Sequence, residues 1–451
     1  MTQPSLRDDA LGIWCAGVAA VASDQLVLRA VHCDGNTLDI AGHSFDLREI
    51  DRILVVGGGK AGAGMAVGLE TALGADLVAA KVTGIVNVPT DCVRTLQRIT
   101  IHAGRPAGVN EPTAEGVAGV DRMLHLVGTM TPRDLLIVLL SGGGSALLPA
   151  PALGISLSDK RTVTRLLMSR GAPIEDLNAV RSALSRFKGG QLAQAIPAGR
   201  AIALIISDVV ADPLSVIASG PTVTVPPVNS SPADILRKYV CDVSEVPAHV
   251  WTVLDQHSLK SAAQLASRVA VTNCIIGNNA TALQAAAAEA LKRGYAIAGY
   301  ETDQRGIARE VGVTLAERCL AEHSRPTTSR GWCWLSGGEP IVELAPYDGP
   351  RRGGRNQELA LSALQRWWDE DLANMVLVSG GTDGEDGPTD AAGGIADAAV
   401  RAQAQSLNLT PRDYLAVNNA YPFLQQTGGL IQTGPTHTNV MDIRVVLSRS
   451  R

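Results

Sequence analysis

Short runs of Val, Ile and Leu recur along the chain, and each ends abruptly in glycine, serine or aspartate. A continuous apolar run is typical of a strand buried on both faces, which predicts parallel sheets. Ligands of open parallel sheets bind outside the carboxyl ends of the strands, where we expect these turns to present backbone N–H groups. The pattern therefore predicts a phosphorylated or carboxylated ligand. The five runs are 53–64 (ILVVGGGKAGAG), 135–149 (LLIVLLSGGGSALLP), 201–213 (AIALIISDVVADP), 334–340 (WLSGGEP) and 375–394 (MVLVSGGTDGEDGPTDAAGG).

The order of the predicted elements indicates an α/β protein. The first 48 residues begin with a helical pattern and continue into a predicted hairpin turn at Asp34-Gly35-Asn36. From Ile53 to about Thr224, strand-like runs alternate with Ala- and Leu-rich helical stretches, as in βαβ units.

A second unit is expected after a turn-rich connection at 222–233. From Val269 the chain reads as a strand, a Gly-Asn-Asn turn, a long helix and another strand. At 451 residues the chain exceeds what one hydrophobic core normally supports, so two domains are expected. We assign them to residues 1–245 and 246–451.

Composition argues against several classes of function. Lys and Arg number 39 against 44 acidic residues, the net charge is −5 and aromatic residues make up 3%, so neither a basic nucleic-acid surface nor a base-stacking platform is expected. The longest apolar runs are strand-sized, and the first residues lack the pattern of a secretory signal, so we expect no membrane span and a cytoplasmic protein. Seven dispersed cysteines are expected to be free buried thiols, and with the dispersed histidines they argue against a zinc site.

The first motif, Gly57-x-Gly59-x-x-Gly62, follows a predicted strand and precedes a predicted helix. That context fits a dinucleotide fingerprint, but Lys60 lies inside the loop and no acidic residue ends the next strand at 82–88. We favour an anion site in which Lys60 supplies a point charge. A tight strand–helix junction with an exposed lysine is the alternative.

The second motif is Ser141-Gly142-Gly143-Gly144-Ser145. Consecutive glycines allow close approach of the backbone to a ligand. A nucleophilic serine is the alternative, but the Gly-x-Ser-x-Gly elbow is not formed. We favour a cradle for anionic groups.

The third motif places Asp208 at the end of a predicted strand. An acidic side chain there reaches a ligand site more readily than the core. Most single aspartates at such positions cap a helix or form a turn, and Asp212 before Pro213 fits that role better.

The fourth motif places Arg355 at the start of a helix that begins near Asn356. A cation there opposes the helix dipole, so we expect an anion between them. Arg351 and Arg352 are expected to be exposed to solvent.

The fifth motif crowds Asp383, Glu385, Asp386 and Asp390 into eight residues. Carboxylates beside a phosphate site are the ligands that Mg²⁺ prefers. A polar surface loop with aspartates as turn formers is the alternative.

Taken together, these motifs resemble the glycerate 2-kinase family whose C-terminal half is called the MOFRL domain, and whose members formerly carried the label hydroxypyruvate reductase. The resemblance covers nearly the whole chain and includes Leu177–Arg181, Leu184–Arg186, Lys188–Gly190 and Thr433–Val440. It implies an N-terminal Rossmann-like parallel sheet flanked by helices, a C-terminal α/β (MOFRL) domain and an active site in the cleft. It also implies ATP- and Mg²⁺-dependent phosphorylation of D-glycerate to 2-phosphoglycerate.

Residue by residue, the resemblance places the family's essential lysine on Lys60, its arginine on Arg355 and its SDV aspartate on Asp208. We expect these three to be catalytic, Asp383 and Asp386 to bind the metal, and the protein to be a monomer or homodimer. Substrate and nucleotide are expected at Gly58, Gly59, Ser141, Gly142, Gly143, Ser145, Asn356, Gly381 and Thr382. The chain departs from the family at four positions: Arg105 replaces His, Ala211 and His437 replace Gly, and Met441 replaces Asn.

Two other functions stay open at this point. An NAD(P)H-dependent hydroxypyruvate reductase would use the Gly57-x-Gly59-x-x-Gly62 loop for its cofactor. A non-catalytic sugar-acid sensor would use the same anion sites without turnover.

Overall fold

A computed structural model describes residues 5–223, 230–258, 269–323 and 325–449. The chain divides into two compact units, which we call the N-terminal unit (Ser23–Ile276) and the C-terminal unit (Met1–Ala22 with Gly277–Arg451). The predicted domains, 1–245 and 246–451, do not coincide with this division and stay a prediction. The difference arises because strand β9 (Val271–Gly277) joins the sheet of the N-terminal unit.

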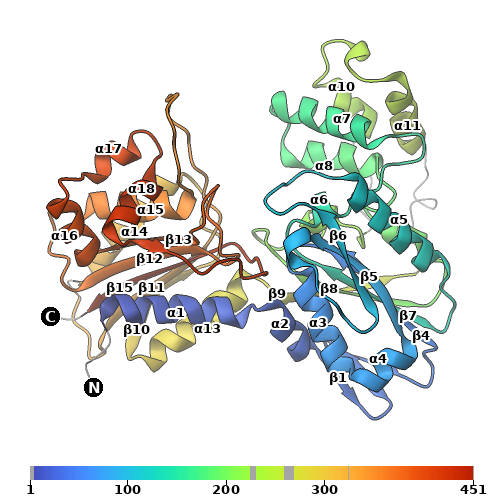
Figure 1. Ribbon diagram of the computed structural model, residues 1–451, viewed down its shortest axis with the longest axis horizontal. Helices are drawn as coiled ribbons and strands as arrows, with labels where there is room; N and C mark the ends of the chain where they lie inside the picture. Colours follow the sequence, from blue (N-terminus) through green and yellow to red (C-terminus); the bar gives the residue numbers. More distant parts are fainter. Residues whose placement is uncertain (1–4, 224–229, 259–268, 324, 450–451) are drawn as a thin grey trace. The chain divides into compact units, whose positions relative to one another are not determined.

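The N-terminal unit is built on a six-stranded sheet in the order β6-β5-β4-β7-β8-β9. The ladders that join β4 to β5 and β7, β5 to β6, and β7 to β8 are all parallel. This order is the doubly wound 3-2-1-4-5-6 arrangement, so the predicted Rossmann-like sheet is confirmed (Figure 1). The bounds of its first five strands are β4 (Arg52–Gly58), β5 (Val82–Pro89), β6 (Ile99–Arg105), β7 (Asp134–Leu140) and β8 (Arg200–Ile206).

Helices cover both faces of this sheet. Helix α5 (Ala114–Gly128) packs on the face that carries Leu54, Val56, Leu136 and Val138. On the other face, Gly62 at the start of α3 (Gly62–Leu73) lies against Val86 and Val88. Other helices of the unit are α2 (Ser23–Ala30), α4 (Ala75–Lys81), α6 (Gly144–Leu147) and α9 (Gln191–Ala195), with 3₁₀ turns η1 (Thr90–Cys92), η2 (Ile217–Ser219) and η3 (Val243–Glu245).

Four further helices form a separate cluster with its own small core. They are α7 (Leu157–Ser169), α8 (Ile174–Ala183), α10 (Pro232–Arg237) and α11 (Ala248–Ser258). An antiparallel three-stranded sheet of β1 (Val31–Asp34), β2 (Thr37–Ile40) and β3 (His43–Asp46) precedes the main sheet. Asp34 pairs with Thr37 across Gly35-Asn36, which confirms the predicted hairpin.

The C-terminal unit holds a second six-stranded sheet in the order β10-β11-β15-β12-β13-β14. Only the β10–β11 pair is parallel, because β15 lies antiparallel between β11 and β12. The expectation that every apolar run indicates a parallel sheet is therefore wrong here: β12 is an apolar run because both of its faces are covered, although its neighbours are antiparallel. The bounds are β10 (Tyr295–Glu301), β11 (Gly331–Gly338), β12 (Met375–Gly381), β13 (Gly393–Asp397), β14 (Leu430–Ile431) and β15 (Asp442–Arg449).

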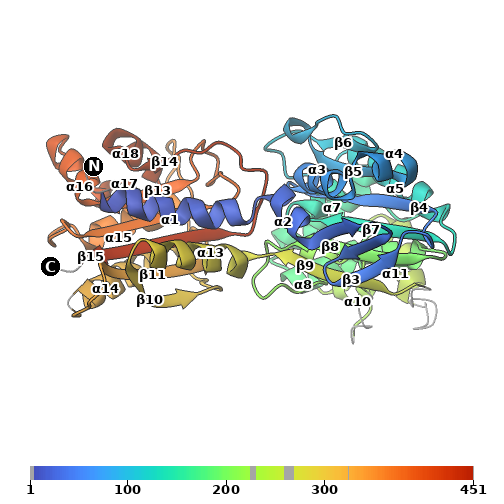
Figure 2. The ribbon, with the colours of Figure 1, turned by 90° about the horizontal axis from the view of Figure 1, so that it is seen from below.

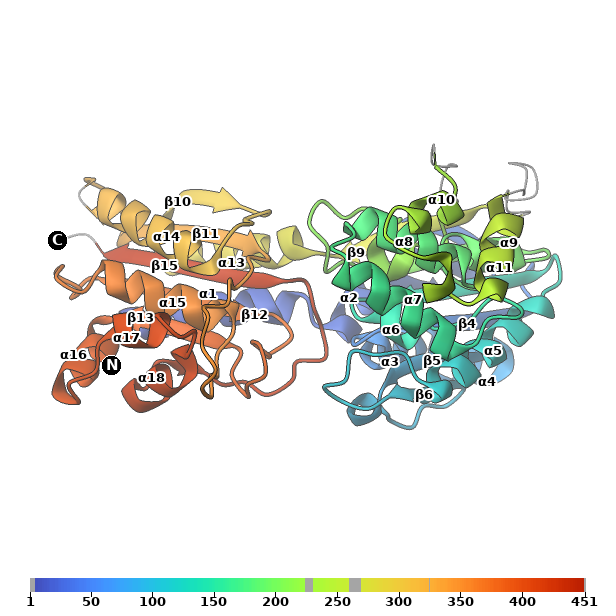
Figure 3. The ribbon, with the colours of Figure 1, turned by 90° about the horizontal axis from the view of Figure 1, so that it is seen from above.

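Two helix layers enclose this second sheet. Figure 2 shows α1 (Leu6–Ala20) and α13 (Asn279–Lys292) together on one face, where α1 contacts β12 and β15. Figure 3 shows α14 (Ala308–His323) and α15 (Arg355–Arg366) side by side on the other face. Helix α1, the first helix of the chain, thus belongs to the C-terminal unit. Three more helices, α16 (Ala398–Ser406), α17 (Pro411–Leu415) and α18 (Ala420–Thr427), complete it.

The absence of membrane spans and the burial of the cysteines are both expected from composition. Within the described residues, no single helix is both long and apolar enough to cross a membrane; the pairs α1 with α2 and α3 with α4 meet those criteria only when each bent pair is counted together. All seven cysteines are free thiols, but only Cys92, Cys319 and Cys333 are buried. The expectation that all seven are buried is wrong, since Cys15 and Cys241 are exposed.

Candidate active site

Three polar loops follow three neighbouring parallel strands of the N-terminal unit. The strand order reverses between β4 and β7, and ligands of doubly wound sheets bind at such a switch point. The loop after β4 and the loop after β7 are joined there: Lys60 N donates to Gly142 O at 2.8 Å, and Ala61 N donates to Ser141 Oγ at 3.1 Å. Ser141 is therefore a support for the Lys60 loop.

The glycines of the first loop allow close packing. Gly57 and Gly59 have φ values of +154° and +149°, which other residues rarely adopt. A Cβ atom at Gly59 would lie 2.0 Å from Ser141 Oγ, and one at Gly62 would lie 2.8 Å from Val86 Cγ1. Contacts inside the protein thus account for the Gly-x-Gly-x-x-Gly spacing without a dinucleotide.

Charged side chains surround the second glycine loop. A Cβ atom at Gly142 would lie 2.2 Å from Asp208 Oδ2. One at Gly143 would lie 3.3 Å from Lys60 Cγ and 3.5 Å from Arg105 Nη2. The structure thus brings Lys60 and Asp208 to one two-glycine turn, and it adds Arg105, which the sequence marks only as a departure from the family.

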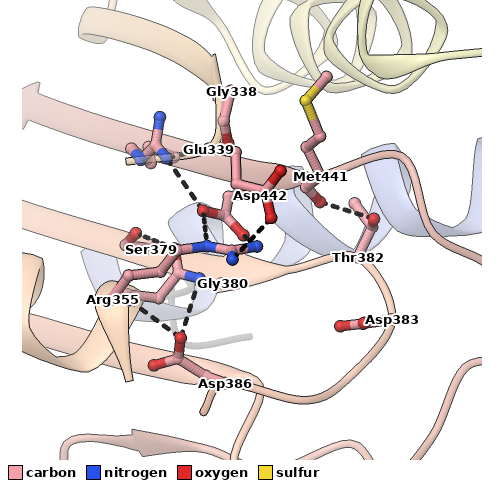
Figure 4. A network of polar contacts seen from close by, with 12 residues as sticks. Gly338, Glu339, Arg355, Ser379, Gly380, Thr382, Asp383, Asp386, Met441 and Asp442 are labelled. Carbon is pink, nitrogen blue, oxygen red and sulfur yellow. Dashed lines mark hydrogen bonds and ion pairs between the residues drawn. The ribbon is translucent and has the colours of Figure 1, made fainter. Parts of the chain in front are cut away.

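The other predicted residues lie in the C-terminal unit. Arg355 opens helix α15 and makes a double contact with Asp442: Nε lies 2.8 Å from Oδ2, and Nη2 lies 2.9 Å from Oδ1 (Figure 4). Its Nη1 donates to Glu339 Oε1 at 2.8 Å. Burial alone would raise the pKa of Asp442, but the charges of Arg355 and Arg444 outweigh burial and hold the pKa below its usual value.

The anion at the start of helix α15 is a protein carboxylate. Asp386 accepts hydrogen bonds from Asn356 N at 3.1 Å and Gln357 N at 2.9 Å, and Asn356 Nδ2 lies 3.3 Å from the same carboxylate. Burial and the charge of Asp442 raise the pKa of Asp386 to about 6, although the two backbone N–H groups oppose this rise. The anion expected next to Arg355 therefore has an internal source.

The loop after β12 separates buried from accessible groups. Thr382 is fully buried, and its hydroxyl donates to Met441 O at 2.7 Å, while Gly381 N donates to Ala392 O at 2.8 Å. Asp383 is half-buried, and its Oδ1 accepts from Glu385 N at 3.2 Å.

No group of three or more metal-binding side chains occurs in the described part of the chain. Magnesium needs only one or two carboxylates beside substrate phosphates, and Asp383 fits that need better than the buried Asp386.

Replacing Asp386 with Ala is expected to lower the free energy of unfolding by about 2 to 4 kcal/mol. The change would leave two buried donors without an acceptor, the N–H groups of Asn356 and Gln357. Urea unfolding at pH 7 measures the effect. Asp386→Asn keeps one acceptor and should lose less. An Ala variant as stable as the unchanged protein would contradict this capping role.

Known proteins resemble this chain over most of its length. Residues 9–255 match a family described as a domain of unknown function, and residues 332–442 match the MOFRL family. A glycerate kinase from Danio rerio is 36% identical over 98% of this chain and 98% of the relative. A glycerate 2-kinase from Pyrococcus horikoshii is 34% identical over 98% of this chain and 97% of the relative.

A solved structure is similar to this chain over its full length. The crystal structure of a Pyrococcus horikoshii protein superimposes with a TM-score of 0.83 at 31% identity, and it covers 100% of both chains. The resemblance predicted from the five motifs is confirmed by relatives that match almost the full length. The chain therefore belongs to the glycerate kinase family that carries a MOFRL domain.

Proposed function

We propose that this protein transfers a phosphoryl group from ATP to the 2-hydroxyl group of D-glycerate and gives 2-phosphoglycerate. The observation that carries the proposal is the meeting of Lys60 and Asp208 at the Gly142-Gly143 turn, beside the switch point of the sheet. A relative named glycerate 2-kinase, identical at 34% of positions, supports the position of the acceptor hydroxyl.

Phosphoryl transfer requires positioning and charge neutralisation more than covalent catalysis. Asp208 would orient the attacking hydroxyl group and take its proton. Lys60 would neutralise charge on the transferring phosphoryl group, and the backbone of Gly58, Gly59 and Ser141–Gly143 would cradle its oxygens. The bond from the γ-phosphorus to the bridging oxygen breaks as the new bond to the 2-oxygen forms, and ADP leaves.

In the C-terminal unit, Arg355 would pair with an anionic group of substrate or nucleotide, and Asp383 would be the carboxylate ligand of Mg²⁺. When bound to ATP, Mg²⁺ supplies neutralising charge to the phosphates. Asn356, Gly381 and Thr382 would act through the loop backbone and the start of α15, because Thr382 is fully buried and Asn356 Oδ1 accepts from the Ser379 hydroxyl at 2.6 Å.

The reductase alternative has one favourable observation, the 3-2-1-4-5-6 strand order with a Gly-x-Gly-x-x-Gly turn after the first strand. A ribose-binding carboxylate would be expected at the end of β5. That strand ends in Asn87-Val88-Pro89, and the buried Asn87 amide donates to Gly116 O and Leu147 O. The kinase is therefore the better-supported function.

An assay of the purified full chain with D-glycerate, ATP and Mg²⁺ tests the proposal. Coupling to enolase and pyruvate kinase detects 2-phosphoglycerate, whereas 3-phosphoglycerate gives a signal only after phosphoglycerate mutase is added. We expect a signal without the mutase. NADH oxidation with hydroxypyruvate, run in parallel without ATP turnover, would replace the kinase with the reductase.

A further inference from the structure

Two cationic side chains contact Ser145, the last residue of the second glycine motif. Arg181, near the end of helix α8, and Lys188, on the segment that follows it, both approach Ser145 at the start of α6. Arg181 Nη2 donates to Ser145 Oγ at 2.6 Å, and Lys188 Nζ donates to Ser145 Oγ at 3.2 Å and also to Ser145 O. Lys188 is only 2% exposed.

No carboxylate offsets these two charges. In the part of the chain that the structure describes, neither Arg181 nor Lys188 forms an ion pair, and their side-chain hydrogen bonds all end on Ser145. A third cation, the buried Lys160, lies nearby, and its ammonium group donates to Arg181 O and Leu184 O. Burial lowers the pKa of Lys188 well below its usual value, and the charges of Arg181 and Lys160 lower it further. Buried unpaired cations are costly, which indicates a partner that comes from outside the chain.

The hydroxyl groups around the cations also point to an acceptor ligand. Ser145 Oγ has two lone pairs, and Arg181 and Lys188 occupy both. The proton of Ser145 must therefore go to Ser219 Oγ, which lies 3.0 Å away. The Ser219 hydroxyl is then left to donate its own proton to another group. Arg181 and Lys188 thus converge on Ser145, whose proton goes to Ser219, and the Ser219 proton is available to an acceptor ligand.

Ser219 is held in this position by a strained backbone. Ala218 and Ser219 have φ values of +50° and +63°, in the left-handed region that is unfavourable for residues other than glycine. Backbone hydrogen bonds of 2.8 Å from Gly189 N to Ser219 O and from Gly190 N to Gly220 O fix the segment next to Lys188. The loop that carries Lys188 and the turn that carries Ser219 thus form one unit.

We propose that Arg181, Lys188 and Ser219 form a subsite for an oxyanion, which is separate from Lys60 and lies two residues along the glycine loop from Gly143. The assignment of its source rests on the proposed function: the oxyanion is either a phosphate group of ATP or the carboxylate of glycerate. Both ligands offer oxygens to a guanidinium, an ammonium and a hydroxyl group.

Calorimetric titrations of the full chain test the subsite with three probes: inorganic pyrophosphate, a non-hydrolysable ATP analogue with Mg²⁺, and D-glycerate. Lys188→Met and Arg181→Met are expected to weaken at least one probe by about 10- to 100-fold, as the loss of charge-assisted hydrogen bonds predicts. A loss for the ATP analogue assigns the subsite to phosphate, and a loss confined to glycerate assigns it to the carboxylate.

Thermal unfolding without ligand separates binding from a structural role. Because an unpaired buried charge is removed, Lys188→Met should melt at the same or a higher temperature. Lys160→Met is the matched control: it removes a buried cation that has no hydrogen bond to Ser145, and its dissociation constants should change less than about threefold. Ser219→Ala tests the site without a change of charge.

Unchanged affinity for all three probes in Lys188→Met and Ser219→Ala would overturn the subsite. So would a lower melting temperature with unchanged affinity, because that result marks a structural lysine. A protein that loses pyrophosphate binding on Lys188→Met but does not phosphorylate glycerate would keep the subsite and refute the proposed function.

Discussion

Replacement of Lys60 by Ala is expected to lower kcat/KM for glycerate phosphorylation by about 10³-fold or more, with the fold intact. A cationic group placed on the transferring phosphoryl group contributes effects of this size. The loop does not depend on the lysine side chain, because it is held by Lys60 N on Gly142 O and Ala61 N on Ser141 Oγ. Steady-state kinetics with the enolase-coupled assay measure the loss.

Two further variants make this prediction specific. Lys60→Arg keeps the charge but moves it, since a guanidinium is larger and planar, and an intermediate activity is expected. Lys292→Ala is the control, because this lysine on α13 has an 80% exposed side chain that is 3.8 Å from Glu289. It should keep full activity. If Lys60→Ala is folded and turns over at a near-normal rate, Lys60 has no part in the reaction.

The fold of the N-terminal unit follows from local sequence rules. Apolar runs that end in glycine or aspartate predict β4, β7 and β8, and the parallel-strand rule places their carboxyl ends at one edge. For the same reason the sequence alone is enough to group Lys60, Ser141–Gly143 and Asp208. The pairing of the C-terminal sheet could not be predicted, because burial on both faces makes β12 as apolar as a parallel strand.

Side-chain contacts between residues far apart in the chain could not be predicted from the sequence. Asp442 is 87 residues from Arg355, and nothing in Val440-Met441-Asp442 indicates an ion pair. Arg181 reaches Ser145 from helix α8 and Lys188 from the segment after that helix, so reasoning from strand ends does not find them. The glycine pair after Lys188 was the one local signal, since Gly189 and Gly190 have φ values of +59° and +78°.

Three of the four departures from the family lie at positions where the backbone has a positive φ. Ala211, His437 and Met441 have φ values of +65°, +56° and +71°, and the resemblance implies Gly, Gly and Asn at these positions in the family. Gly and Asn tolerate the left-handed region better than other residues do, which explains the family's preference. The fourth departure, Arg105, lies beside Lys60 at Gly143 and changes the charge of the site instead.

Replacement of Asp442 by Ala is expected to lower the free energy of unfolding by about 3 to 5 kcal/mol, the range for a broken buried ion pair. Arg444 is fully buried, and its Nη2 lies 3.1 Å from Asp442 Oδ2, so its charge would lose its carboxylate partner. Arg355 would lose its double contact with Asp442 and keep only Glu339. Because the pKa of Asp442 is depressed, its contribution is present above about pH 4 and is lost as the pH falls further. Urea unfolding at pH 7 and at pH 3.5 should therefore show a smaller difference between the variant and the unchanged protein at the lower pH.

A positioning role for Asp442 requires a kinetic effect as well as a loss of stability. Asp442→Asn keeps the shape of the side chain but not its charge, and below its melting temperature it should still lower kcat, because Arg355 loses its fixed orientation. Glu339→Gln is the control: it removes the half-exposed partner of Arg355 and should change stability by less than about 1 kcal/mol. If Asp442→Asn is destabilised but has a normal kcat, Asp442 only holds the sheet together, and Arg355 needs no fixed orientation for turnover.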